Sequence, residues 1–156
     1  MMSKRLLFVV VSLALCAPLL ADSNLPKSNT RAAIKAYVER AAKVVAKKGP
    51  SCEEFAEKDW KGGDYYIFVL GPDDKLVCHP NPSLVGKPAS DVKDVNGRVV
   101  GQEIADVGKK KNGGWIDYPW PRPGTEKSVP KSTFATHVKG PDGKTYVLGA
   151  GGYEVK

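Results

Sequence analysis

The sequence predicts an α+β fold in which a long N-terminal helix packs on a central antiparallel sheet of about five strands. Residues 30–48 carry apolar side chains at helical spacing, which predicts the helix. Later in the chain, short runs rich in aromatic and β-branched residues alternate with Gly, Pro and Asp turns, which predicts strands joined by hairpins. The chain has 156 residues, a length typical of one domain.

The helix over residues 30–48 is expected to have one apolar face. Thr30 can cap its beginning, and the Gly-Pro pair at 49–50 ends it. The apolar face must pack on another surface, either the back of the sheet or the same helix of a second chain, so a homodimer through this helix is one expectation. A second, short helix is expected to begin at Ser51, because Ser51 and Glu54 match a capping box.

Five segments are expected to form the strands of the sheet: residues 64–70, 75–79, 115–120, 132–139 and 145–150. The segment between the second and third strands is long, and a short helix is expected over 98–108 within it. Long ordered insertions over a sheet usually build binding sites rather than cores. This segment is therefore the expected cover of a site.

Residues 1–21 are typical of a signal peptide, with a positively charged start, an apolar core and a proline break. The apolar run has about 16 residues, fewer than the roughly 20 that a membrane-spanning helix needs. Cleavage after Ala21 would give a periplasmic or secreted protein, whereas an uncleaved segment would remain as a membrane anchor. A polar leader, 22–29, and a single domain, 30–156, follow.

The charge of the exported chain is moderate. Removing Lys4 and Arg5 leaves 22 basic side chains against 17 acidic ones, a net charge of +5. The lysines are scattered, and no Arg-rich stripe or nucleic-acid-binding motif occurs, so nucleic acid is not an expected partner. Solubility is the simpler explanation of the charge.

Two cysteines, Cys52 and Cys78, remain after export. An even pair in an oxidising compartment predicts one disulfide, which would close a loop of about 27 residues and stabilise the fold by roughly 3–4 kcal/mol. The alternatives are a thiol nucleophile beside His79 or a metal site. Adjacent residues of a strand point to opposite faces, which is the wrong geometry for His79 to take the thiol proton of Cys78. No metal or cofactor is expected.

The stretch 113–131 combines aromatic residues, prolines and a closing lysine. Strand alternation places Trp115 on one side and Tyr118 and Trp120 on the other. Pro119 and Pro121 are expected to end this strand, because proline cannot donate to a sheet ladder, and a stiff loop would then bring Lys131 back towards the rings.

A wall of aromatic rings beside one cation suits a small anionic ligand, because the rings exclude water and the ammonium pairs with a carboxylate. The alternative is that the rings form core and that Lys131 is a solvated surface charge. Tyr118 is expected to offer its hydroxyl to the ligand. One of the two tryptophans is expected to belong to the hydrophobic core. His79 either donates to the anion or satisfies the loop backbone. The ligand-binding side chains expected are Tyr66, Phe68, His79, Trp115, Tyr118, Trp120, Lys131 and Tyr153. The opposite set of the first strand, Tyr65, Ile67 and Val69, is the alternative to Tyr66 and Phe68.

Six segments occur in a characteristic order: YYIFV (65–69), CHPNPSLVGK (78–87), DVNGR (94–98), GGWIDYPW (113–120), PK (130–131) and YVLGAGGY (146–153). In this order the chain resembles the single Cache domain, an extracytoplasmic sensor fold related to PAS, over about residues 30–156. The resemblance implies a long N-terminal helix, an antiparallel sheet and a pocket roofed by the loop between strands two and three. It also implies a sensor of small molecules, often short organic acids, with the lysine of the Pro-Lys pair reaching the ligand carboxylate.

The family usually forms the ectodomains of chemoreceptors and histidine kinases, but no membrane helix or signalling domain follows Lys156 in this sequence. The expected function is therefore an exported sensor that binds a short organic acid and reports through a partner, a membrane receptor or histidine kinase. One alternative is a structural or regulatory protein that acts on a receptor without its own ligand. An enzyme such as a small hydrolase is not expected, and no catalytic residue is assigned, because the usual hydrolase motifs do not occur.

Overall fold

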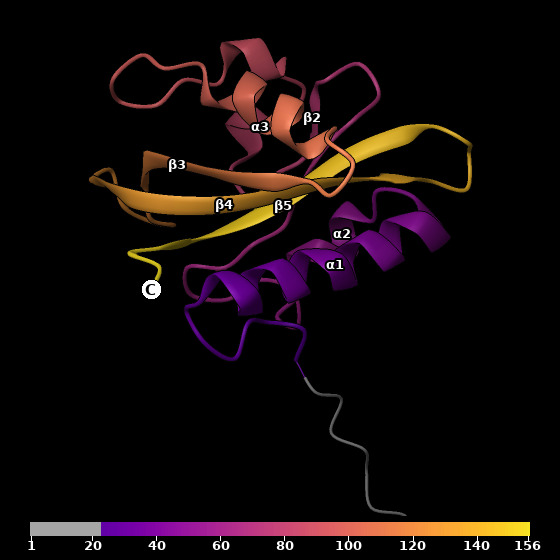
Figure 1. Ribbon diagram of the computed structural model, residues 1–156, viewed down its shortest axis with the longest axis horizontal. Helices are drawn as coiled ribbons and strands as arrows, with labels where there is room; N and C mark the ends of the chain where they lie inside the picture. Colours follow the sequence, from indigo (N-terminus) through magenta and orange to yellow (C-terminus); the bar gives the residue numbers. More distant parts are fainter. Residues whose placement is uncertain (1–22) are drawn as a thin grey trace, which may run out of the picture.

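The computed structural model describes residues 23–156 (Figure 1), so the expected signal peptide lies outside the described residues. In chain order the helices and strands are α1 (Arg31–Lys48), α2 (Cys52–Ala56), β1 (Phe68–Leu70), β2 (Leu76–Cys78), α3 (Val100–Gly108), β3 (Gly114–Pro121), β4 (Ser128–Lys139) and β5 (Thr145–Tyr153). Two 3₁₀ turns, η1 (Pro82–Leu84) and η2 (Ala89–Asp91), lie in the segment between β2 and α3.

The strands form one five-stranded antiparallel sheet in the order β2-β1-β5-β4-β3 (Figure 1). Helices α1 and α2 lie on one face of this sheet, and α3 lies on the other (Figure 1). The predicted fold class is confirmed, because a long N-terminal helix packs on a central antiparallel sheet of five strands.

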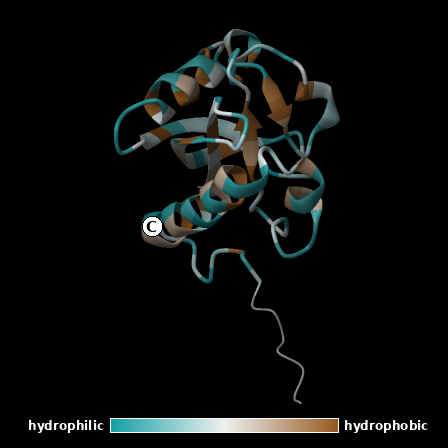
Figure 2. Ribbon diagram, turned by 90° about the vertical axis from the view of Figure 1, so that its right-hand side faces the viewer, coloured by the Kyte–Doolittle hydropathy of each residue, from teal (hydrophilic) through white to brown (hydrophobic). Residues whose placement is uncertain are grey.

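Helix α1 begins and ends where its sequence predicts. The Thr30 side chain accepts a hydrogen bond from the Ala33 backbone at 3.3 Å, and Gly49 ends the helix at a φ of 83°. Its buried face packs against the sheet and comprises Ile34, Tyr37, Val38, Ala41 and Val45. Figure 2 shows the hydrophobic residues concentrated in the strands between more hydrophilic outer segments. Within residues 23–156, no helix combines the length and the apolar character that crossing a bilayer requires.

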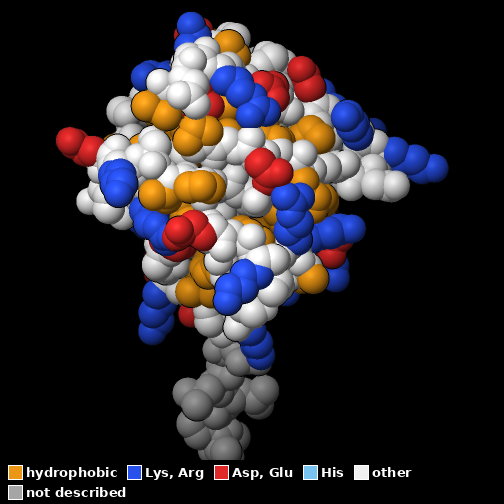
Figure 3. All heavy atoms as spheres, turned by 60° about the vertical axis from the view of Figure 1, so that its left-hand side comes forward, with side chains coloured by type: hydrophobic (Ala, Val, Ile, Leu, Met, Phe, Trp, Pro, Cys, Tyr) orange, Lys and Arg blue, Asp and Glu red, His pale blue; other side chains and the backbone are white. Residues whose placement is uncertain are grey.

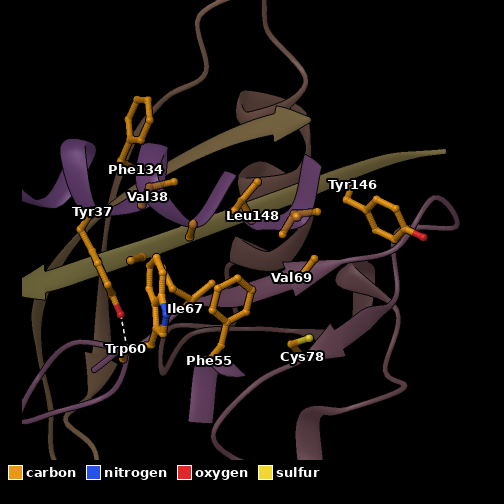
Figure 4. Packing of buried hydrophobic residues seen from close by; sticks show 13 residues of the cluster. Tyr37, Val38, Phe55, Trp60, Ile67, Val69, Cys78, Phe134, Tyr146 and Leu148 are labelled. Carbon is orange, nitrogen blue, oxygen red and sulfur yellow. Dashed lines mark hydrogen bonds between the residues drawn. The ribbon is translucent and has the colours of Figure 1, made fainter. Parts of the chain in front are cut away.

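The core between α1 and the sheet is built around Trp60, which stacks on Tyr37 and meets Phe55 edge-on (Figure 4). The Tyr37 hydroxyl donates to the Trp60 carbonyl, so the phenol is buried with its hydrogen bond made. The predicted disulfide is present: Cys52 is joined to Cys78, with their Cα atoms 5.2 Å apart. This bond ties α2 to the edge strand β2 and leaves Cys78 no thiol for catalysis.

The prediction that two prolines end the third strand is wrong. Strand β3 runs through Pro119 to Pro121, which pair with Pro130 and Ser128 of β4. Because β3 is the outermost strand of the sheet, its unpaired side needs no backbone donors, and proline is tolerated there. The expected loop is consequently reduced to residues 122–127, and Lys131 lies within β4.

Other boundaries differ from the predicted ones. Strand β1 is shorter than 64–70, because Gly62 and Tyr65 exchange backbone hydrogen bonds and form a tight turn before it. Strand β5 is longer than predicted because it pairs with β4 along its whole length, and β4 is longer because its first residues, 128–131, pair with β3. The capping box at Ser51 does not form: its hydroxyl donates to the Gly49 carbonyl at 3.3 Å instead.

Candidate ligand-binding site

The face of the sheet opposite α1 contains a small, mostly apolar cavity under the segment that joins β2 to β3. Its volume of about 30 Å³ exceeds the roughly 10–15 Å³ that one water molecule requires. The lining residues are Tyr66, Phe68, Leu70, Leu76, His79, Leu84, Ala89, Val92, Val100, Gly101, Ile104, Tyr118, Trp120 and Lys131. A wider hollow of about 600 Å³ adjoins the cavity, shares four of its lining residues and provides a route to solvent.

Lys131 is the cation of this cavity. It lies on β4 between Tyr118 of β3 and Tyr153 of β5, and only 2% of its surface is exposed. The ammonium donates to the Tyr66 hydroxyl at 2.7 Å and lies 4.3 Å from the centre of the Tyr66 ring and 5.1 Å from that of Tyr153. The alternative of a solvated surface lysine is therefore wrong.

The electrostatic setting of Lys131 is unusual because none of the residues that line the cavity is acidic. Burial lowers the pKa of Lys131 to about 7, and the charge of Asp64 opposes this shift only in part. Asp64 is itself paired with Arg122. An amine in this position gains strongly from any anion that enters the cavity, because the low polarity of the surroundings strengthens the attraction.

Glycines of β5 make the space that Lys131 occupies. A Cβ atom at Gly151 would lie 2.6 Å from Cε of Lys131, and one at Gly149 would lie 2.6 Å from the Phe68 ring. Any larger residue at these positions would displace the side chains that cross over the strand. The run of small residues in β5 is thus a local condition for burying the lysine.

His79 lies half-buried at the edge of the cavity, with its ring 5.3 Å from that of Tyr66 in an edge-on arrangement. Its Nδ1 accepts the backbone N–H of Asn81 at 3.0 Å, so in the neutral ring the proton is on Nε2. Burial and the nearby charge of Lys131 lower the pKa of His79 to about 4. Above that pH, the ring is a neutral Nε2–H donor.

Tyr66, Phe68, Tyr118 and Trp120 also line the cavity, as strand alternation allows. The Tyr118 hydroxyl is 2.9 Å from the Thr133 hydroxyl, and the Trp120 ring meets the Tyr118 ring edge-on at 5.8 Å. Burial raises the pKa of Tyr118, so the phenol stays neutral.

Two expected site residues lie elsewhere. Trp115 is on the α1 face of the sheet, where it packs against Phe134 and under the Arg31 guanidinium, so it is the tryptophan that belongs to the core. Tyr153 is beside Lys131 but is not among the lining residues, and its hydroxyl donates to the Pro121 carbonyl at 2.6 Å.

The apolar cover of the cavity was not predicted residue by residue. Helix α3 and turn η2 meet so closely that a Cβ atom at Gly101 would lie 2.3 Å from the Ala89 carbonyl. Both segments are short, so periodicity gives little information about them. The spacing of Val100 and Ile104, which lie on the buried side of α3, is the sequence signal that this helix covers the sheet.

The comparisons with known proteins agree with this architecture. The family profile described as Single Cache domain 2 matches residues 10–154. The chain belongs to the single Cache domain 2 family. Cache domains are extracytoplasmic sensor domains, and a similar solved structure, described as the periplasmic sensor domain of a chemotaxis protein, is 30% identical with a TM-score of 0.53. That match covers 79% of this chain and 74% of the other.

Two further relatives of this Cache domain are informative. A solved structure described as the basis for carboxylic acid recognition by a Cache chemosensory domain is 28% identical, with a TM-score of 0.52, over 77% of this chain and 73% of the other. The methyl-accepting chemotaxis protein McpP of Pseudomonas putida is 32% identical over 90 residues, which are 57% of this chain. The match spans 16% of that receptor's length.

Proposed function

We propose that this Cache domain is an exported sensor module that binds a short monocarboxylate, with the carboxylate on Lys131. The observation that carries the proposal is a buried lysine in an apolar cavity with no acidic residue among those that line it. A buried cation without an anionic partner is unfavourable, and a bound carboxylate supplies that partner.

Three hydrogen-bond donors from residues that line the cavity are expected to meet the carboxylate. Besides the ammonium of Lys131, these are the hydroxyl of Tyr66, 2.7 Å from it, and the Nε2–H of His79, whose ring contacts Tyr66. The hydrocarbon part of the ligand would lie against the leucine, valine and isoleucine side chains of the cavity. This division of polar and apolar contacts matches a carboxylate with a short tail.

The size and charge of the cavity select among small acids. A volume of about 30 Å³ favours ligands of a few heavy atoms, such as acetate, propionate, lactate or pyruvate. An amino acid would bring an ammonium group that none of the lining residues can pair with a carboxylate. The similar Cache domain described as recognising carboxylic acids supports the same ligand class.

The domain would report through a separate membrane receptor or histidine kinase, and pairing through α1 stays a prediction.

The alternative of an interaction protein without its own ligand requires a large exposed apolar stripe on α1. In the described residues the exposed large hydrophobic side chains are Val85 and Val95, and neither is in that helix. On the face shown in Figure 3, hydrophobic side chains are interspersed with charged ones. We also propose that the domain performs no catalysis on its ligand.

Thermal unfolding with and without short carboxylates tests the proposal. Acetate, propionate, lactate or pyruvate should raise the Tm, because a ligand at 100 times its Kd stabilises by about 2.7 kcal/mol. Lys131→Met should abolish the shift, whereas Lys139→Met, an exposed lysine of the same strand, should leave it unchanged. No shift with any of these acids in the wild-type protein, or an equal shift in Lys131→Met, would contradict the proposal.

A further inference from the structure

We propose that carboxylate capture by this domain takes up one proton from solution, so that the sensor responds to an acid anion more strongly as the pH falls. The inference rests on the proposed function, since it concerns the same site. It concerns what happens to the Lys131 amine before and after the ligand arrives.

The surroundings of the amine determine its state in the free protein. The titratable groups that face it from the neighbouring segments are Asp64, Tyr66, His79, Tyr118 and Tyr153. Burial raises the pKa of all three tyrosines, so they stay neutral, and His79 is neutral above about pH 4. The cover formed by η1, η2 and α3 contributes only apolar or glycine lining: Leu84, Ala89, Val92, Val100, Gly101 and Ile104.

The acidic side chains around Lys131 are paired with other groups. Arg122 binds both Asp64 and Glu154, and its guanidinium lies over the Tyr153 ring. Asp117, beside a surface depression that reaches Lys131, accepts hydrogen bonds from Arg31 and Ser132. Within residues 23–156 no carboxylate pairs with the amine, and its direct polar contact is the Tyr66 hydroxyl.

This arrangement makes the neutral amine the stable form of the free site above about pH 7. A carboxylate that enters the cavity pairs well only with an ammonium, so the amine binds a proton from solvent as the ion pair forms. The overall step joins one anion, one proton and the neutral amine, and no covalent bond is made or broken. Binding should weaken roughly tenfold per pH unit above about 7 and level off below it.

Calorimetry with acetate on the full domain tests this step. At about pH 8, titrations in phosphate and in Tris, which differ in ionisation enthalpy, should differ by the heat of about one proton taken up per acetate bound. The Kd for acetate should rise roughly tenfold between about pH 8 and pH 9. In Lys131→Arg, which stays charged at all these pH values, both the proton uptake and the pH dependence should disappear.

The outcomes separate this inference from the proposed function. Acetate binding with the same heat in both buffers and a constant Kd would overturn proton uptake and leave carboxylate binding standing. No binding of acetate, propionate, lactate or pyruvate between about pH 6 and pH 9 would overturn both. If the arginine does not fit beside Gly151, the wild-type titrations decide alone, and a lysine Cε NMR titration of the free protein should show one group that titrates near pH 7.

Discussion

The two faces of the sheet are covered in different ways, although the same strands supply both. On one face, the 18-residue helix α1 packs over a continuous cluster that includes Trp60 and Tyr37. On the other, the 9-residue helix α3 and two single-turn segments cover a cavity that holds Lys131. A long regular helix fills its face with interlocking side chains, whereas short pieces joined by loops leave room for a ligand.

Strand alternation assigns these roles within single strands. On β4, Phe134 belongs to the α1 side, and Lys131 and Thr133 belong to the cavity side. The pleat of the sheet, rather than distance along the chain, therefore separates the core residues from the residues of the candidate site. Changes on the α1 face should therefore alter stability, and changes on the cavity face should alter ligand affinity and pH dependence.

The largest expected effect is on the α1 face. Trp60→Ala should lower the free energy of unfolding by about 3–5 kcal/mol, because it removes a buried ring that contacts Tyr37 and Phe55. Urea denaturation measures this loss, and Val95→Ala, at a side chain that is 69% exposed, is the control, with an expected change within about 0.5 kcal/mol. The division of roles would be broken if the folded Trp60 variant bound acetate much more weakly than the wild-type protein.

The next effect is a pH dependence of stability that belongs to the cavity face. The pKa of Lys131 is about 7 in the folded domain, against an ordinary value of 10.5. Between these values the unfolded chain binds more protons than the folded domain, so the free energy of unfolding should rise with pH, by about 2–3 kcal/mol from pH 7 to pH 9. Urea denaturation across this range should show the rise in wild-type protein and in Lys139→Met.

In Lys131→Met the same rise should be absent, and the variant should be more stable than wild type at pH 7, because a buried charge has been replaced by an apolar chain of similar length. If the free energy of unfolding of Lys131→Met still rose with pH as in the wild-type protein, another group would be responsible for the rise. The buried charge would then no longer distinguish the cavity face from the α1 face.

The smallest expected effect concerns His79. Removing its Nε2–H donor in His79→Phe should weaken acetate binding by about 0.5–1.5 kcal/mol, or roughly 2- to 13-fold, the usual contribution of one hydrogen bond. Calorimetry with acetate at pH 7 measures the change. His137→Phe is the matched control, since that ring contacts the Gly108 carbonyl away from the cavity. Equal affinities for the wild-type protein and His79→Phe would remove this side chain from the site.

The sequence predicts the parts of the fold that depend on local patterns. Helix α1, with its cap at Thr30, and the segregation of Trp115 from Trp120 follow from periodicity alone. Which of the two tryptophans faces the cavity depends on where α1 and α3 pack, and local spacing contains no such information. For the same reason the local pattern wrongly predicts that Pro119 and Pro121 end the strand, since only the strand order shows that β3 is at the edge.

The burial of Lys131 was also beyond local reasoning, because it depends on three strands meeting around one side chain. The cover of the cavity comes from short turns whose packing partners are distant in the chain. The glycines of β5 were visible in the sequence, but the reason for them, close approach by side chains from other strands, is a tertiary contact.

Gly151 has a consequence for how variation in this protein should be interpreted. The residue offers no side chain to a ligand, and yet a single added methyl would push the amine of its neighbour out of place. Loss of sensing would then arise at a position that never touches the stimulus. In a survey of inactive variants, substitutions of Gly151 should therefore be found together with substitutions of Lys131.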